Sequence, residues 1–236
     1  LHRVEVLAAA RDVMAGHGII ALEEPPDPAF SHMLTGREAI SSYLEDRMPE
    51  VPEYSRRQYE TLRKLHKTGT AVAQVDPFMA ELEAIHDGFE NGGRPEDLRS
   101  DPVRWDVYQA EKRWTGALLA YYTAVAGNDF ERMVEAVRAF TTADAERGRL
   151  RDAMRAEALA QLATRDGSLY VEAGSVHAAL VGELRRRVGR RLPLPASSHG
   201  VSRRVTNLSS SMPPPPLRSA ALAAPAATNW CDTVWP

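Results

Sequence analysis

Three short, mainly apolar runs constrain the fold of this chain more than any other feature. They cover residues 19–22, 70–75 and 169–173, and glycine or proline lies close to each of them. The first run is apolar at every position, which is typical of a strand covered on both faces and therefore of a parallel sheet. Stretches with helical periodicity separate the runs. This alternation predicts an α/β fold with a mostly parallel sheet flanked by helices.

The segments between these runs are predicted to be mainly helical. We expect helices over about 29–46, 54–67 and 79–89, a loop over 91–101, and a helical insertion over about 101–166 before the last strand. A further helix opens the chain, although in α/β order a strand usually precedes such a helix. We therefore expect a strand upstream of Leu1.

The composition of the chain changes near residue 192. Ser, Pro and Ala dominate residues 192–236, which include four consecutive prolines at 213–216 and show no periodicity. Such a segment cannot bury enough apolar surface to order itself. We predict an α/β domain over residues 1–191 and a low-complexity, disordered tail over 192–236.

Charge is distributed unevenly along the chain. Residues 1–184 carry 21 Lys and Arg against 31 Asp and Glu, whereas residues 185–236 carry 8 against 1. Because phosphate binding needs a basic face, the acidic main body argues against a nucleic-acid partner. The basic segment from Arg185 to Arg204 leaves an anionic partner open, although arginines at a helix C-terminus are usually solvated.

Other features of the sequence limit the cellular compartment of the protein and the kinds of site that it can contain. The single cysteine, Cys231, excludes an internal disulfide framework and a Cys-rich zinc site. The longest apolar stretch, from Gly116 to Gly127, is too short to span a bilayer. We expect no membrane span and a cytoplasmic protein, unless an export signal precedes Leu1.

Polar residues follow each of the three predicted strands. Glu23 and Glu24 follow the first, Asp76 follows the second, and Gly174 to His177 follow the third. Ligands of parallel sheets bind beyond the carboxyl ends of the strands, so we expect these residues to converge on one edge. There a carboxylate beside a histidine can polarise water or orient the ring as a base. The alternatives are that Glu23 or Asp76 caps the following loop and that His177 merely precedes a helix.

Several familiar motifs are absent from the sequence. The histidines show no paired metal-ligand spacing on a helix, and no phosphate-binding loop occurs, which argues against a nucleotide. A Gly-x-Ser-x-Gly elbow is also missing, which argues against the usual α/β serine hydrolases. We interpret the aromatic stripe of Trp114 and Tyr121 as part of the core.

The order of these motifs resembles the superfamily of erythromycin esterase-like, ChaN-like haem-binding and TIKI/TraB proteins. The resemblance covers about residues 3–188, and it implies that Glu23 is the strand-ending acid and His177 the histidine of the second Gly-x-x-His motif. The first Gly-x-x-His motif of the family is absent. Its Arg-x-Arg-x-Met helix is matched only in part by Arg151 and Met154, because Ala153 replaces the second arginine; the nearest substitutes are Arg147 and Arg149.

The resemblance first implies a hydrolase that attacks an ester or amide bond of a small molecule or peptide. Glu23 and His177 would activate water or position the base, and Arg151 would stabilise developing negative charge. The residues expected to contact the ligand are Glu24, Asp76 and Gly174. A metal-assisted variant would use Glu23 and His177 as ligands of a divalent ion, although two ligands are too few for such a site.

Two alternatives follow from the same resemblance. The first is a haem- or iron-binding uptake protein, in which a histidine, Tyr121 or Tyr122 would be the axial ligand of haem. The second is a truncated, non-catalytic member whose fold persists without chemistry.

Overall fold

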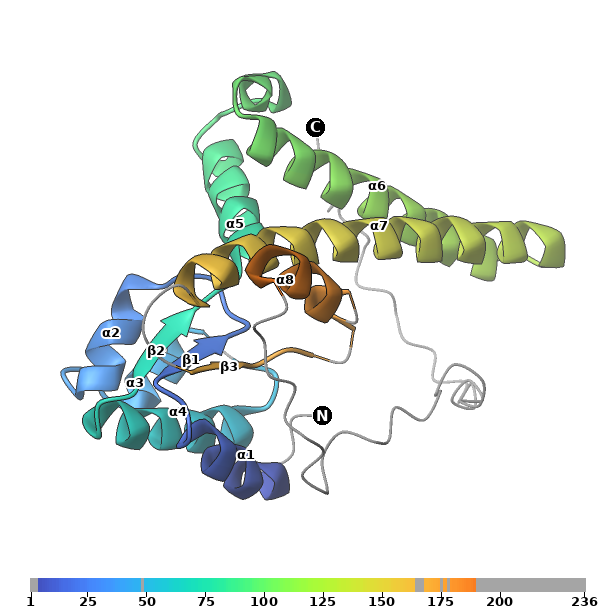
Figure 1. The fold of residues 1–236 in the computed structure, drawn as a ribbon. Coiled ribbons are helices and arrows are strands. Elements are labelled where there is room, and N and C mark those ends of the chain that lie inside the picture. The colour runs from blue at the N-terminus through green and yellow to red at the C-terminus, as the bar shows by residue number, and fades with distance from the viewer. Residues whose placement is uncertain (1–3, 48, 164–167, 175, 178, 190–236) are drawn as a thin grey trace. The chain divides into compact units, whose positions relative to one another are not determined.

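The structure is a computed structural model that describes residues 4–47, 49–163, 168–174, 176–177 and 179–189. Its sheet has three strands in the order β2-β1-β3 (Figure 1), namely β1 (Ile19–Leu22), β2 (Ala71–Gln74) and β3 (Leu169–Val171). Both outer strands run parallel to β1, with Ile20 between Val72 and Tyr170. The predicted parallel sheet is therefore confirmed.

One face of the sheet packs against the helices that precede β2. These are α1 (Leu7–Met14), which a 3-10 turn at Val4–Val6 introduces, α2 (Pro28–Thr35), α3 (Ile40–Glu45) and α4 (Pro52–Lys67). Ile20 and Leu22 of β1 are completely buried and pack in one cluster with Met33, Tyr43 and Leu62 of these helices. Burial of each such side chain contributes about 1.5–3 kcal/mol to folding.

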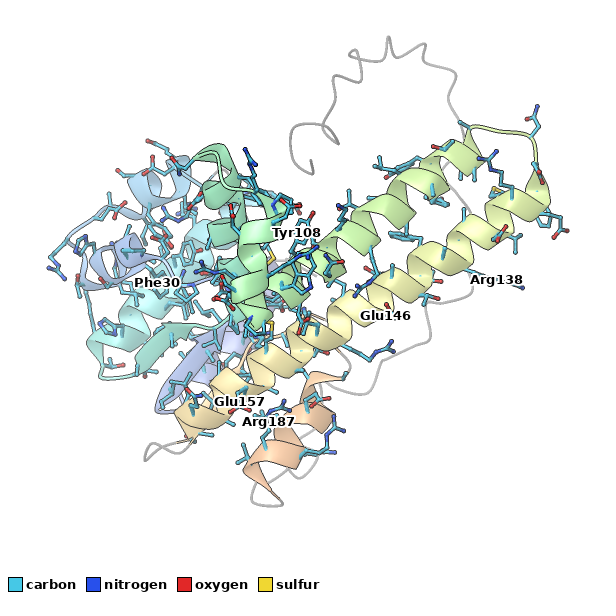
Figure 2. The ribbon with its side chains drawn as sticks, turned by 90° about the horizontal axis from the view of Figure 1, so that it is seen from above. Phe30, Tyr108, Arg138, Glu146, Glu157 and Arg187 are labelled. Carbon is cyan, nitrogen blue, oxygen red and sulfur yellow. The ribbon has the colours of Figure 1, made fainter. Side chains whose placement is uncertain are left out.

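The opposite face is covered by helices from the second half of the domain. Figure 1 shows α7 (Phe130–Ala163) and α8 (Leu180–Val188) on the other side of the sheet from α1 and α4. Ala156 and Leu159 of α7 and Leu184 of α8 are buried there. The predicted helical insertion begins at α6 (Pro102–Val125), which runs beside α7 (Figure 2), and α5 (Pro77–Glu90) with the 3-10 helix Pro95–Ser100 leads into it.

Three helices begin with the same local device. Asp27, Asp76 and Asp101 are the N-cap residues of α2, α5 and α6, and each accepts a hydrogen bond from a backbone N–H of the first turn. A proline follows each of them at the first helical position, where its missing N–H costs nothing. Asp76 follows β2 closely and begins α5. This fixes the position of the Asp76 side chain at the edge of the sheet.

The order of the strands creates a crevice. The chain leaves β1 toward the helices of one face and leaves β3 toward α8 on the other face, so the two connections diverge (Figure 1). Such a topological switch point is where open parallel sheets bind ligands. The carboxyl ends of β1 and β3 are thus the favoured place for a site.

The structure differs from the sequence-based expectations in detail. The helix expected over 29–46 is divided into α2 and α3, because Gly36 adopts a left-handed conformation with φ 81° at the end of α2. The loop expected over 91–101 contains a 3-10 helix, and helices dominate the domain more than the phrase α/β suggests. The expected tail at 192–236 lies outside the described residues, and the strand expected before Leu1 stays a prediction. Among the helices that the structure describes, none has both the length and the apolar character needed to cross a membrane.

Candidate active site

Glu23, directly after β1, is the centre of a compact ionic cluster. Its Oε2 accepts a hydrogen bond of 2.6 Å from the backbone N–H of Gly174, and its Oε1 lies 2.6 Å from Nε2 of His177. Two arginines of α7 approach the same carboxylate: Nη2 of Arg151 lies 3.3 Å from Oε1, and Nη1 of Arg155 lies 3.4 Å from Oε2. Glu23 therefore joins the ends of β1 and β3 to α7.

His177 lies between two carboxylates. Its Nδ1 is 2.5 Å from Oδ1 of Asp152 on α7, while Nε2 faces Glu23, and the ring is almost completely buried. The contact with Glu23 raises the pKa of His177, and the contact with Asp152 acts in the same direction, whereas burial opposes both. The arrangement favours a protonated imidazolium held between the two acids.

Asp76 combines a structural role with a place in this cluster. The side chain is completely buried, and Oδ1 accepts a hydrogen bond of 3.2 Å from the N–H of Met79 at the start of α5. Oδ2 accepts one of 2.9 Å from Nε of Arg151, which also pairs with Asp76 through Nη2. The sequence left open that Asp76 caps the following loop; Asp76 instead caps the helix α5, and the same carboxylate also anchors an arginine beside Glu23.

Arg155 connects the ends of all three strands. Its side chain is completely buried, Nε donates to the carbonyl of Val75 after β2 at 2.8 Å, and Nη2 donates to the carbonyl of Glu172 after β3. Nη1 faces Glu23 after β1, although no described residue offers it an aligned hydrogen bond. One guanidinium, brought by the helical insertion, therefore fixes the spacing of the carboxyl edge.

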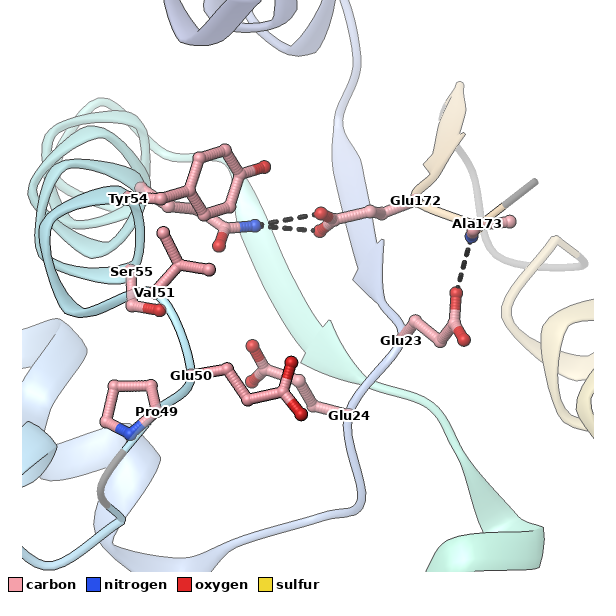
Figure 3. Close-up of a pocket in the computed structure, with 11 residues that line it drawn as sticks. Glu23, Glu24, Pro49, Glu50, Val51, Tyr54, Ser55, Glu172 and Ala173 are labelled. Atoms are coloured by element: carbon pink, nitrogen blue, oxygen red, sulfur yellow. Dashed lines mark hydrogen bonds between the residues drawn. The ribbon is translucent and has the colours of Figure 1, made fainter. Parts of the chain in front are cut away.

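A pocket of about 500 Å³ opens at the switch point beside this cluster (Figure 3). We call it the switch-point pocket. Glu23 and Glu24 after β1, Glu172 to Gly174 after β3, and the start of α4 form its wall. On α4, Nε2 of Gln58 donates to both carboxylate oxygens of Glu172 at 2.9 Å, as the dashed lines in Figure 3 show. Glu172 is therefore held in one orientation at the edge of the pocket.

The two carboxylates that follow β1 and β3 differ strongly in their pKa values. Burial, together with the charges of Glu24 and Glu23, raises the pKa of Glu172 to about 7, although the hydrogen bond from Gln58 and the charge of Arg155 act in the opposite direction. Burial also acts to raise the pKa of Glu23, but the contacts with His177, the N–H of Gly174 and the charge of Arg155 together lower it to about 2. At neutral pH Glu23 is ionised, whereas Glu172 is protonated in about half of the molecules.

Glu24 points to another set of partners. Its Oε1 accepts a hydrogen bond of 3.0 Å from the hydroxyl of Tyr59, and its Oε2 accepts one of 2.8 Å from Nε2 of Gln74. Burial raises the pKa of Glu24, and both hydrogen bonds oppose that rise. Glu24 also lines the switch-point pocket, and these two hydrogen-bond partners lie on α4 and β2.

The structure brings together most of the residues that the sequence singled out. Glu23, Asp76, Arg151, Gly174 and His177 form one connected cluster, and Glu24 lies at the pocket wall next to it. The two suggested substitutes for the missing arginine do not reach it. Arg147 pairs with Glu111 of α6 at 2.5 Å, and Arg149 is exposed.

Sequence reasoning missed Asp152, Arg155, Gln58 and Glu172. Glu172 gave a usable signal, because β3 ends at Val171 and Glu172 is its first polar successor, as Glu23 is for β1. The expected strand extended to residue 173 and therefore included Glu172. Asp152 and Arg155 lie within a long charged helix, where no spacing distinguishes a side chain that faces a sheet.

The residues present do not fit a metal ion. Both ring nitrogens of His177 lie against carboxylate oxygens, so neither of them is open to a further ligand. Among the residues that the structure describes, no three His, Cys, Asp or Glu side chains are arranged to hold a metal. The switch-point pocket does not suit haem either, because haem needs an apolar slot and four glutamates line this pocket, while Tyr121 stacks on Phe140 in the α6–α7 pair.

Comparison with known proteins gives one distant relative. The chain is 30% identical over 178 residues to an uncharacterized protein from Archaeoglobus fulgidus, and the match covers 75% of this chain and 59% of the archaeal protein. The chain thus spans less than two thirds of the length of that relative. No family model matches the sequence, and no solved structure matches it significantly. The resemblance to erythromycin esterase-like, ChaN-like and TIKI/TraB proteins therefore stays a prediction.

Proposed function

We propose that this chain is a hydrolase in which Glu172 activates water against an ester or amide bond bound in the switch-point pocket. One observation carries the proposal: Glu172, at the pocket edge, has a pKa of about 7, whereas Glu23 at the next strand end has a pKa of about 2. Carboxylates whose environments separate their pKa values in this way are the usual mark of distinct acid and base roles. A pKa near 7 is also the most effective value for proton transfer at neutral pH.

The reaction needs no group beyond water and Glu172. The oxygen of water attacks the carbonyl carbon, and the water proton passes to the carboxylate of Glu172. The bond between the carbonyl carbon and the leaving oxygen or nitrogen then breaks, and Glu172 returns the same proton to the leaving group. The products are a carboxylic acid and an alcohol or amine, and Glu172 ends ionised as it began.

The ionic cluster around Glu23 supports this chemistry, although its residues take no part in proton transfer or bond breaking. His177 has both ring nitrogens against the carboxylates of Glu23 and Asp152, so it is poorly placed to act as a base, and together with Arg151 it holds Glu23 in position. The resemblance implies that His177 either acts as the base or positions it, and this geometry favours the positioning role. The hydrogen bond from Gly174 to Glu23 holds the β3 end against β1 and so orients Glu172.

The test is hydrolysis of a panel of chromogenic esters and anilides by the wild type and by Glu172→Gln. For the wild type we expect turnover that rises with pH through a midpoint near 7, because the base acts when ionised. The variant should lose about 10²–10⁴-fold in rate. Glu90→Gln, at the exposed end of α5, should retain full activity. A folded Glu172→Gln variant that hydrolyses a responsive substrate at the wild-type rate would refute the proposal.

A further inference from the structure

A second pocket adjoins the switch-point pocket. It has a volume of about 620 Å³, and we call it the proline pocket after four of its lining residues, Pro25, Pro26, Pro28 and Pro49. Glu24, Pro49 and Ser55 line both pockets. Because they share these residues, the two pockets have a common wall, and Glu24 lies between them.

The walls of the two pockets contain more acidic than basic residues. The switch-point pocket is lined by Glu23, Glu24, Glu50 and Glu172, and the described residues add no lysine or arginine to its wall. The proline pocket adds Asp46 and Glu83, which are exposed, and the pair formed by Asp27 and Arg47. The guanidinium of Arg47 lies 3.7 Å from the centre of the Tyr43 ring and pairs with Asp27, and its charge also acts to lower the pKa of Glu24.

Size and charge together define the ligand that such a cleft accepts. A compact small molecule fills a single pocket of about 300–1,000 Å³, so a ligand that uses both pockets must be elongated. Carboxylates along both pockets favour positive groups at separated points of that ligand and repel anions.

We propose that the two pockets form one cleft that binds a flexible chain carrying amino groups, as in an acylated polyamine or a lysine-containing peptide. Its amines would meet Glu50 and Glu24 in one pocket and Asp46 and Glu83 in the other. The inference rests on the proposed function in one respect: the bond to be cut lies beside Glu172, and the chain extends from there past Glu24.

Calorimetric titration of the full chain with a short and a long amine tests this cleft. Spermine reaches both pockets, whereas putrescine fits in one. The double variant Asp46→Asn, Glu83→Gln should bind spermine about fivefold more weakly and putrescine equally well, because two surface charges contribute about 1 kcal/mol together. The control Glu45→Gln, Glu90→Gln removes the same charge from exposed positions outside both pockets and should leave both affinities unchanged.

Two results would overturn the inference. One is spermine binding no tighter than putrescine, and the other is an equal loss in the control variant. An N-acetylated trilysine amide in a parallel titration identifies the source, since tighter binding of trilysine indicates a peptide and tighter binding of spermine a polyamine. Because binding is measured without turnover, amine binding without hydrolysis would refute only the hydrolase, whereas hydrolysis of neutral esters without amine binding would refute only this inference.

Discussion

At the scale of residues, the chemistry of this chain depends on neighbours more than on residue type. Glu23 and Glu172 are the same amino acid, and each directly follows a parallel strand. Glu23 meets His177 and two arginines, whereas Glu172 meets the neutral amide of Gln58 and the charge of Glu24. The sequence could indicate which residues end the strands, but not which of them would be neutralised, because two of the neutralising groups, Arg151 and Arg155, lie on the distant helix α7.

The first prediction concerns the imidazole of His177. Replacement of Asp152 by Asn keeps an oxygen for Nδ1–H but removes one of the two negative charges that raise the pKa of His177. We expect the pKa of His177 to fall in Asp152→Asn, as measured by the pH dependence of its ring nitrogen shifts in NMR. Asp144→Asn, at an exposed position on the same helix, is the control. An unchanged pKa of His177 in Asp152→Asn would show that the charge of Asp152 does not affect the ring.

At the scale of elements, the strands were predictable and the role of the insertion was not. The first strand has the expected bounds, because four consecutive apolar residues between glycines and prolines leave few alternatives. The insertion was predicted as helical, yet nothing in its amphipathic pattern showed that α7 would place Arg151, Asp152 and Arg155 against the sheet. Contacts between residues 75 and 80 positions apart, such as those of Arg151 and Arg155, depend on the tertiary arrangement and leave no local signal.

The second prediction tests Arg155 as the link between the strand ends. Arg155→Met removes the donors to the carbonyl of the buried Val75 and to the carbonyl of the half-buried Glu172. We expect the free energy of unfolding, measured by urea denaturation, to fall by about 2–4 kcal/mol. Arg149→Met, on the exposed face of the same helix, should change it by less than about 0.5 kcal/mol. Equal effects of the two substitutions would contradict the assigned role of Arg155.

At the scale of the whole domain, the strand order turns scattered residues into a site. The strand β1 is central, and its parallel neighbours β2 and β3 lie on its two sides. The segments after β1 and β3 therefore diverge and leave the switch-point pocket between them. The sequence predicted that the carboxyl edge would collect the polar residues. It could not predict the order β2-β1-β3, and therefore not that Glu172 rather than Asp76 would line the pocket.

The measurement that most directly tests this account is a ¹³C NMR titration of the side-chain carboxyl of Glu172, assigned by comparison with Glu172→Gln. We expect a midpoint near pH 7, with the protonated form of Glu172 dominant below it and the ionised base above it. A midpoint near 4.5, the ordinary value for glutamate, would show that the pocket does not perturb Glu172 and would remove the basis for its role as the base.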